Sequence, residues 1–334
     1  MSEKVKNKPI AVVTGANGFV GSHLVELLLK KNYHVKCIIR KTSNLRWIEH
    51  LPVEFYDCGL TDVASLKRVF EGADYIFHIA GVVGARKPEI FYIGNVETTR
   101  IVLDAASGIS TIKKILVTSS LAASAPTVQG QPVTEMTPSQ PVSTYGKSKV
   151  EQEKLSHSYM DKLPIVIIRP PVIYGPRDTE VLLLFKTIKK GLMGLIGSKE
   201  KYLSFVYIRD LVNGMWLAAT SEKAKGQTYF LSSVPAEYGY SELSQAIADA
   251  LGTKPFKLRV PHSVLYFAGA MAQFFGKFSS KPPTLHLEKV REMTCDSWSC
   301  SSEKAIIEIG YQPEVHLSEG LRKTVDWYKK EGWL

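Results

Sequence analysis

Short apolar runs alternate with helical segments through the first half of the chain, and this alternation narrows the choice of fold most. Such runs are typical of strands buried on both faces of a parallel sheet. They lie at residues 10–13, 35–39, 53–56, 75–79, 115–118 and 165–168. Apolar residues with helical spacing lie between them, as at 22–31 and 63–70. The alternation therefore predicts an α/β fold built on a doubly wound parallel sheet.

The rhythm changes after residue 176, which indicates a second structural unit. A helix is expected at 182–190, and the glycines Gly191, Gly194 and Gly197 predict a loop after it. A strand that returns to the sheet is expected at 205–208, followed by a helix at 210–220 and a strand at 228–232. Helices are then expected at 241–251 and 264–275, with a short run at 257–260 between them, and a carboxy-terminal helix should end near Trp333.

These elements predict two units in a chain of 334 residues. Residues 1–177 form a dinucleotide-binding domain, to which 203–232 returns. Residues 178–202 and 233–334 form a smaller, mostly carboxy-terminal substrate-binding domain.

A glycine-rich turn, Gly15-Ala16-Asn17-Gly18-Phe19-Val20-Gly21, stands between the first strand and the first helix. Gly15 permits a tight turn, Gly18 lets the backbone approach a pyrophosphate, and Gly21 lets helix and strand pack closely. The helix start adds free N–H groups and the positive end of a dipole. An ordinary strand-to-helix loop is the alternative, but the position favours a dinucleotide site of the Rossmann type.

The end of the second strand bears on the choice of cofactor. An NAD enzyme usually places a carboxylate there for the ribose hydroxyls, whereas this chain has Arg40 and Lys41, followed by Ser43. Two cations and a hydroxyl suit a 2′-phosphate. NADP(H) is therefore favoured and NAD(H) remains possible, since a solvated basic pair would look the same.

Tyr145 and Lys149 are four residues apart and share one face if the segment is helical. Ser119 and Ser120 close the strand at 115–118, at the edge where parallel sheets bind ligands. A ketone that accepts hydride needs a proton, and a lysine cation would lower the high pKa of a phenol. Ser120 could then hydrogen-bond the substrate oxygen, although a capping hydroxyl is the simpler interpretation.

Ser120, Tyr145 and Lys149 occur together with Asn95, the segment 169–177 and the turn at 14–21. With this set of motifs the chain resembles the extended short-chain dehydrogenases/reductases over nearly its whole length. The branch with 3β-hydroxysteroid dehydrogenases and dihydroflavonol reductases is the most similar. The resemblance implies that Ser120, Tyr145 and Lys149 are catalytic, that Lys149 holds the nicotinamide ribose and that Asn95 supports the site. It also implies a homodimer.

The same resemblance implies further contacts. Cofactor contacts are expected from the turn residues, the basic group after the second strand and the strand ends, namely Gly15, Asn17, Gly18, Phe19, Val20, Gly21, Arg40, Lys41, Ser43, Ala80, Tyr145, Lys149, Pro170 and Val172. Substrate contacts are expected from Val83, Leu121, Ala122 and Thr144. One departure is Cys58-Gly59, which stands where the family usually has Gly-Asp for adenine, with Asp57 displaced.

Two departures concern the substrate. Nucleotide-sugar members commonly have asparagine and arginine where this chain has Val172 and Leu203. Apolar residues cannot pair with a diphosphate, whose desolvation is costly. The sequence therefore favours a reductase or dehydrogenase for an apolar alcohol or ketone. A sugar epimerase or dehydratase, and a cofactor-binding protein without activity, are the alternatives.

Charge and composition exclude several classes. The chain has 42 Lys and Arg against 32 Asp and Glu, a net charge of +10, but the basic residues are scattered and the run Lys4, Lys6, Lys8 lacks interleaved aromatics. No nucleic-acid partner is expected. No membrane span, secretion signal or metal-ligand spacing is visible, and His78 is expected to be structural. The four cysteines, Cys37, Cys58, Cys295 and Cys300, are expected to be reduced thiols in a cytoplasmic protein.

Residues 264–275 form an apolar stretch of 12 residues that is too short to span a bilayer. A core helix of the substrate domain is the favoured interpretation. A segment that touches a membrane surface is the alternative.

Overall fold

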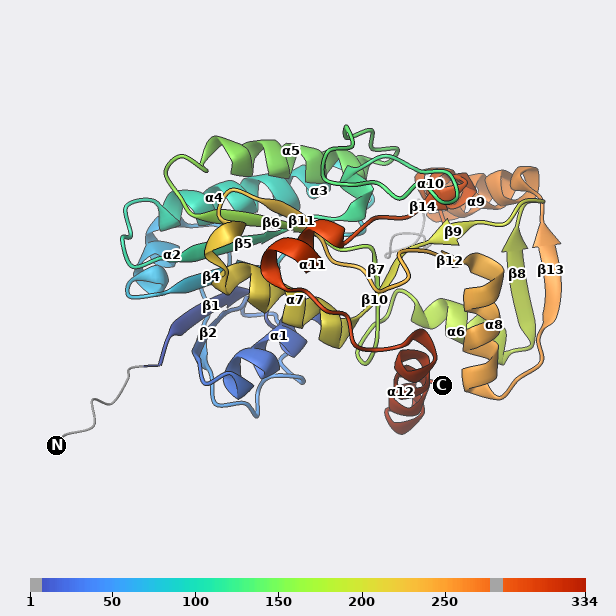
Figure 1. Cartoon of the computed structure of the whole chain (residues 1–334), viewed down its shortest axis with the longest axis horizontal. Coiled ribbons are helices and arrows are strands. Elements are labelled where there is room, and N and C mark those ends of the chain that lie inside the picture. Colours follow the sequence, from blue (N-terminus) through green and yellow to red (C-terminus); the bar gives the residue numbers. More distant parts are fainter. Residues whose placement is uncertain (1–7, 277–284) are drawn as a thin grey trace.

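The protein is described by a computed structural model over residues 8–276 and 285–334; Lys4 and Lys6 of the basic run lie outside these ranges. A seven-stranded sheet forms its centre (Figure 1). The strands, all paired in parallel, are ordered β11-β6-β5-β4-β1-β2-β3. They are β1 (Ile10–Thr14), β2 (His34–Ile38), β3 (Glu54–Tyr56), β4 (Tyr75–His78), β5 (Lys114–Thr118), β6 (Ile165–Arg169) and β11 (Thr228–Phe230). The predicted doubly wound sheet is confirmed.

Helices cover both faces of this sheet because neighbouring strand residues point to opposite sides. Val13 packs in one core with α1 (Phe19–Lys30) and α7 (Ile208–Thr220), whereas Val12 packs in another with α2 (Val63–Phe70) and α4 (Thr98–Ala106). Helix α5 (Thr144–Ser158) lies beside α4. Short elements complete this half: α3 (Pro88–Tyr92), the π-helix Ile93–Glu97 and the 3-10 helices Leu121–Ala123 and Glu222–Ala224.

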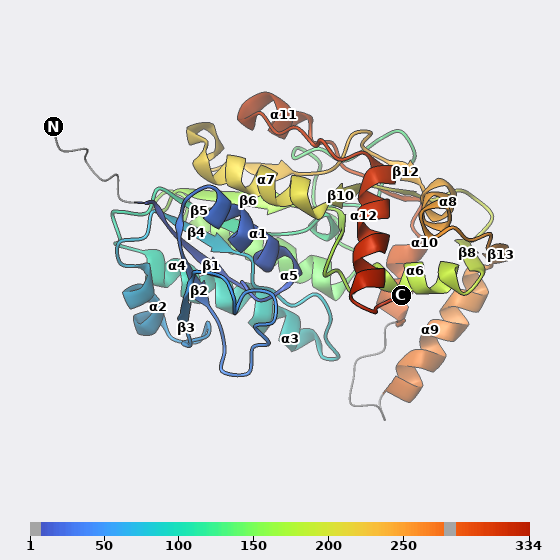
Figure 2. The ribbon, with the colours of Figure 1, turned by 90° about the horizontal axis from the view of Figure 1, so that it is seen from below.

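Most of the remaining elements gather at the other end of the molecule, whereas α11 (Glu303–Ile309) packs against β11 and the 3-10 helix Glu222–Ala224 (Figures 1 and 2). The other helices are α6 (Leu182–Lys189), α8 (Tyr240–Leu251), α9 (His262–Gly276), α10 (Leu287–Thr294) and α12 (Leu317–Lys330). The strands are β7 (Val172–Tyr174), β8 (Leu192–Ile196), β9 (Tyr202–Leu203), β10 (Phe205–Tyr207), β12 (Tyr238–Gly239), β13 (Phe256–Val260) and β14 (Ser297–Trp298). One apolar core runs from the sheet, through Ile168 and Tyr174, to Leu243 on α8 and Tyr328 on α12. This continuous core holds the second group of elements against the carboxyl edge of the sheet.

Three expectations about the bounds and pairing of the elements are wrong. The loop predicted at Gly191–Gly197 contains strand β8, which pairs with β13, because apolar residues such as the buried Met193 separate the glycines. The strand predicted at 205–208 exists as β10, but it pairs with β7 in a separate two-stranded sheet. Helix α1 begins at Phe19, three residues before the prediction, since Gly18 is its N-cap.

The stretch 264–275 is helical but is not a core helix. It forms most of α9, whose large apolar side chains are largely exposed. Within the described residues, no helix combines the length and the hydropathy that crossing a bilayer requires. All four cysteines are free thiols.

Candidate active site

The glycine-rich turn brings three backbone segments into contact. Gly15 has a positive φ of 68°, and a Cβ placed on it would lie 2.8 Å from the backbone nitrogen of Ala80. A Cβ on Gly21 would lie 2.1 Å from the carbonyl oxygen of Gly15. Only glycine fits at either position.

The start of α1 has unused donors. Its N-cap is Gly18, which has no side chain to accept from the first N–H groups, and the first turn contains no acidic residue. The backbone N–H groups of Phe19 and Val20 therefore face an open, positively polarised helix end. This cradle fits a pyrophosphate, so the residues present suit a dinucleotide.

The loop after β2 lies against the same turn. The Asn17 side-chain amide donates to the carbonyl oxygen of Asn44 at 3.3 Å. The Arg40 backbone N–H donates to the Ser43 hydroxyl at 3.0 Å, and the Ser43 N–H donates to the Arg40 carbonyl at 2.8 Å. This tight turn leaves the Arg40 and Lys41 side chains exposed beside the cradle.

The predicted catalytic residues come from two adjacent elements. Ser120 follows β5, and α5 begins immediately before Tyr145, with the Ser143 hydroxyl accepting from the Gly146 N–H at 3.2 Å. A Cβ on Gly146 would lie 2.2 Å from the Ala122 carbonyl oxygen. The glycine thus lets the start of α5 approach the loop that carries Ser120.

The hydroxyl of Ser120 has two roles. It accepts from the Ala122 N–H at 3.1 Å, so it caps the short helix that follows it. It also interacts with the Tyr145 phenol. Burial raises the pKa of Tyr145 to about 12, although the interaction with Ser120 acts to lower it. The predicted low pKa of Tyr145 is therefore wrong for the protein alone, because burial dominates and keeps the phenol neutral at pH 7.

The ammonium group of Lys149 is buried and held by two acceptors. It donates to the Thr118 carbonyl at 2.8 Å and to Gln152 Oε1 at 2.9 Å. It lies 5.9 Å from the centre of the Tyr145 ring. Burial lowers the pKa of Lys149 to about 7, while the Glu153 carboxylate acts in the opposite direction.

Asn95 is fully buried and ties three segments together. Its Oδ1 accepts from the Val82 N–H at 2.8 Å, and its Nδ2 donates to the Val82 carbonyl at 3.0 Å and to Ser148 Oγ at 2.9 Å. Ser148 precedes Lys149 on α5. Asn95 therefore fixes the loop after β4 against the catalytic helix.

A buried polar chain that the sequence analysis missed connects Lys149 to β1. Gln152 Nε2 donates to Thr99 Oγ1 at 2.8 Å, and this hydroxyl itself donates to the Asn95 carbonyl at 2.6 Å. His78 Nε2 lies 2.9 Å from the same hydroxyl, while its Nδ1 lies 2.8 Å from Thr14 Oγ1. Because the Thr99 hydroxyl donates its proton to the Asn95 carbonyl, its oxygen must accept from His78. Neutral His78 therefore carries its proton on Nε2.

Burial lowers the pKa of His78 to about 3, with the Lys149 cation acting in the same direction. His78 is thus a structural link of this chain, as predicted. Gln152 could have been suspected from sequence alone, because it lies three residues after Lys149 on a helix.

A second missed group is a buried ion pair beneath the site. Glu153 accepts from Arg169 Nε at 2.8 Å and from the Ser119 hydroxyl at 2.5 Å. Both charged side chains are almost fully buried. The pair joins α5 to the ends of β5 and β6.

The predicted substrate residues do not all face one opening. Val83 is 64% exposed, whereas the Leu121 side chain is buried against Phe230 and Cys300. Thr144 is half-buried, and its N–H and hydroxyl donate to the Glu288 carboxylate of α10 at 3.1 and 2.6 Å. Helix α10 was not expected to contact the start of α5, since 144 residues separate them.

The predicted cofactor residues at the strand ends are also placed. The Ala80 N–H donates to Thr14 Oγ1 at 3.2 Å, the Pro170 carbonyl accepts from the Leu121 N–H at 2.9 Å, and Val172 is partly exposed on β7. All of these lie at the carboxyl edge of the sheet.

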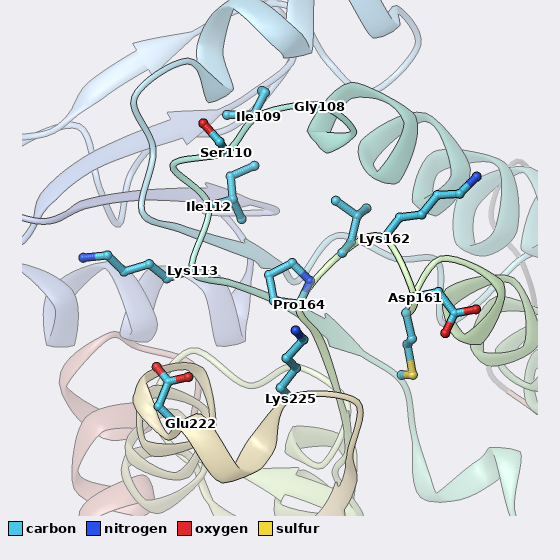
Figure 3. A pocket seen from close by; sticks show the side chains of 12 residues that line it. Gly108, Ile109, Ser110, Ile112, Lys113, Asp161, Lys162, Pro164, Glu222 and Lys225 are labelled. Atoms are coloured by element: carbon cyan, nitrogen blue, oxygen red, sulfur yellow. The ribbon is translucent and has the colours of Figure 1, made fainter.

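A hollow of about 470 Å³ lies at the opposite edge of the sheet, before β5 and β6 (Figure 3). Side chains of both charges line it, including Lys113, Lys162, Glu222 and Lys225. It is separate from Tyr145, and no cluster of metal-ligating side chains occurs in the part of the chain that the structure describes.

The sequence profile of the NAD dependent epimerase/dehydratase family matches residues 11–232. The chain belongs to this family. The match spans the turn, the sheet and all three residues Ser120, Tyr145 and Lys149. Members are enzymes, and this chain is a dehydrogenase or reductase of the family, in agreement with the prediction.

Similar proteins cover nearly the whole chain. A ceramide reductase of Caulobacter vibrioides is 28% identical over 331 residues, which cover 97% of this chain and 96% of that protein. The 3beta-hydroxysteroid-dehydrogenase/decarboxylase isoform 1 of Arabidopsis thaliana is 27% identical over 347 residues, covering 94% of this chain and 78% of that protein. The crystal structure of a UDP-glucose 4-epimerase of Thermotoga maritima with UDP-glucose superposes with a TM-score of 0.79 at 21% identity, over 96% of this chain and 99% of that one, which shows the shared fold.

Proposed function

We propose that this protein uses NADP(H) to interconvert a secondary alcohol and a ketone on an apolar small molecule of steroid, terpenoid or flavonoid type. The observation that carries the proposal is the Tyr145 phenol, which interacts with Ser120 and has the Lys149 ammonium 5.9 Å from the centre of its ring. Two relatives are named for a ceramide and a hydroxysteroid, both lipids. Their names support an apolar substrate here.

In this proposal Tyr145 is the general acid and base. During reduction its O–H proton passes to the carbonyl oxygen while a hydride adds to the carbonyl carbon, and oxidation reverses both transfers. The nicotinamide, when bound, supplies or accepts the hydride. Ser120 donates to the reacting oxygen, and the Lys149 cation stabilises the phenolate that remains. The high pKa of Tyr145 keeps the phenol protonated at neutral pH.

For the cofactor, the turn from Gly15 to Gly21 would hold the pyrophosphate, and Arg40 and Lys41 would pair with a 2′-phosphate. Titration calorimetry with NADPH and NADH on the wild type and on Arg40→Asp tests this. NADPH should bind more tightly, and the variant should reverse the preference. Tighter NADH binding by the wild type would contradict the role of Arg40.

For the reaction, the absorbance of reduced nicotinamide is followed with a panel of ketosteroids and long-chain keto amides. Turnover should appear in the wild type and vanish in Tyr145→Phe, which retains the ring but has no proton to transfer. UDP-glucose is the matched control substrate. Its conversion without net change in absorbance would instead support a nucleotide-sugar epimerase.

The remaining predictions concern organisation. We propose that residues 178–202 and 233–334 enclose the substrate, that Val83, Ala122 and Thr144 line its approach, and that the protein is a cytoplasmic homodimer. Cross-linking of the native protein at several concentrations tests the dimer.

A further inference from the structure

Helix α9 exposes several large apolar side chains. Its sequence from Ser263 to Phe275 contains no Asp, Glu, Lys or Arg. Surface helices of water-soluble proteins carry polar residues on the outer side, so this helix departs from the rule. Phe267 is 69% exposed and Phe275 is 60% exposed.

The exposed side chains share one side of the helix. Val264, Phe267, Met271, Phe274 and Phe275 follow the spacing i, i+3, i+7, i+10 and i+11, and all five are exposed. We call these five residues the apolar stripe. Figure 2 shows α9 extending away from the body of the molecule.

The opposite side of α9 is packed. A Cβ on Gly269 would lie 2.8 Å from Val290 Cγ2, so glycine allows a close approach between α9 and α10. The Tyr266 hydroxyl lies 3.4 Å from Thr294 Oγ1 of α10. The stripe therefore faces outward because α10 holds the helix from the inner side.

Basic side chains stand immediately before the stripe. Lys254, Lys257 and Arg259 are exposed on β13 and the turn that precedes it, and β13 runs into α9. Between Asp249 and Glu288 the sequence contains no acidic residue. An apolar stripe on a segment that has exposed cations and no acidic residue suits the surface of an anionic bilayer, where rings enter the interface and cations meet headgroups.

We propose that the apolar stripe and the adjoining cations form a docking surface for an anionic lipid bilayer. A second copy of the chain fits less well. A symmetric interface would bring together two copies of a segment that carries cations and no acidic residue, which offers no charge complementarity.

Docking here would also orient the active site. Helix α10 supports α9 and reaches the start of α5, where Glu288 binds Thr144, the neighbour of Tyr145. A lipid leaving the bilayer at α9 would thus lie near the catalytic helix. The docking itself does not depend on the proposed reaction, so its test requires no substrate.

The experiment is co-sedimentation of the whole protein with vesicles of phosphatidylcholine, with and without phosphatidylglycerol. The wild type should bind the anionic vesicles, and added salt should weaken the binding. Phe267→Glu combined with Phe275→Glu should lower the partition coefficient by more than about tenfold. Lys254→Gln with Lys257→Gln should lower it only for anionic vesicles; Arg259 is left intact because its guanidinium binds the Gly197 and Ser198 carbonyls.

The matched control is Ile307→Glu, since Ile307 on α11 is 70% exposed but lies far from α9. It should bind vesicles like the wild type. NADPH binding and circular dichroism show that each variant is folded, and Phe267→Ser is the milder replacement if the double variant is not. Absence of wild-type binding, or equal binding by the stripe variants, overturns the proposal. If the wild type is a dimer that the stripe variants convert to monomers, and it does not bind vesicles, the proposal is overturned and the stripe is an interface with a second copy of the chain.

Discussion

Replacing Gln152 by leucine tests how the catalytic lysine is held. Gln152 Oε1 accepts one hydrogen bond from the Lys149 ammonium at 2.9 Å, and leucine keeps the volume without the acceptor. A hydrogen bond to a charged group contributes about 1.5 to 3 kcal/mol, which corresponds to a change of about 1 to 2 in pKa. Since burial already lowers the pKa of Lys149 to about 7, we expect Gln152→Leu to lower it to about 5 to 6.

The direction of the effect follows from the charge. If the reaction needs the Lys149 cation, activity falls as the pH rises through the pKa of this group. The high-pH decline of kcat should therefore begin at lower pH in Gln152→Leu than in the wild type. Gln152→Glu should shift the decline to higher pH, because a carboxylate stabilises the neighbouring ammonium.

The assay is the pH profile of kcat with a ketone found active in the panel, together with NADPH titrations at each pH. Gln245→Leu is the matched control, because it makes the same change on helix α8 and removes only a hydrogen bond to Asp249. A purely structural role would lower the melting temperature and leave the profile in place. Superimposable profiles for the wild type, Gln152→Leu and Gln152→Glu would refute the reasoning.

Three further predictions concern the supports of the site. His78 has a pKa of about 3 in the folded protein against 6.5 in the unfolded chain, so protonation favours the unfolded state as the pH falls below 6.5. Between pH 7 and pH 5 the free energy of unfolding of the wild type should fall by about 2 kcal/mol more than that of His78→Gln, which urea midpoints would show. Gly21→Ala should weaken NADPH binding more than about tenfold, because its Cβ would lie 2.1 Å from the Gly15 carbonyl; unchanged affinity in calorimetry would contradict the cradle. Glu153→Gln should cost about 3 to 5 kcal/mol of unfolding free energy, since it leaves the buried Arg169 guanidinium without its counterion; a loss below 1 kcal/mol in chemical denaturation would show that the pair is dispensable.

The sheet could be predicted because its signal is local. Each buried strand is a short apolar run, and a parallel sheet buries both of its faces, so composition alone marks the strands. Six of the seven sheet strands were expected as members of it from such runs. The glycine turn was equally visible, because Gly15 and Gly21 are required by backbone contacts within one strand-to-helix connection.

The partners of β10 were not predictable in the same way. A run of three buried residues at Phe205–Tyr207 indicates a strand but not which strand it pairs with. Its pairing with β7 depends on the break at Pro170 and Pro171, which separates β7 from strand β6 of the main sheet. Glycine spacing misled at 191–197, since glycine is compatible with a strand whose neighbours supply the burial.

The polar chain behind Lys149 escaped prediction for another reason. Thr14, His78, Thr99 and Gln152 come from four elements, and each alone has an ordinary structural interpretation. Only their meeting at one place gives the assignment of the His78 proton and the fixed position of Lys149. Polar networks of this kind depend on distances across the sheet, which no periodicity encodes.

The exposure of α9 also could not be predicted from the sequence pattern. Hydropathy and length predicted no membrane span for this segment and favoured a buried helix, because an apolar helix usually belongs to a core. The structure places α10 on one side only, through the contact between Gly269 and Val290, and leaves the apolar stripe outward. Whether a helix is buried depends on which other elements the fold packs against it. The apolar residues of α9 that α10 does not cover are therefore the basis of the docking surface that we propose.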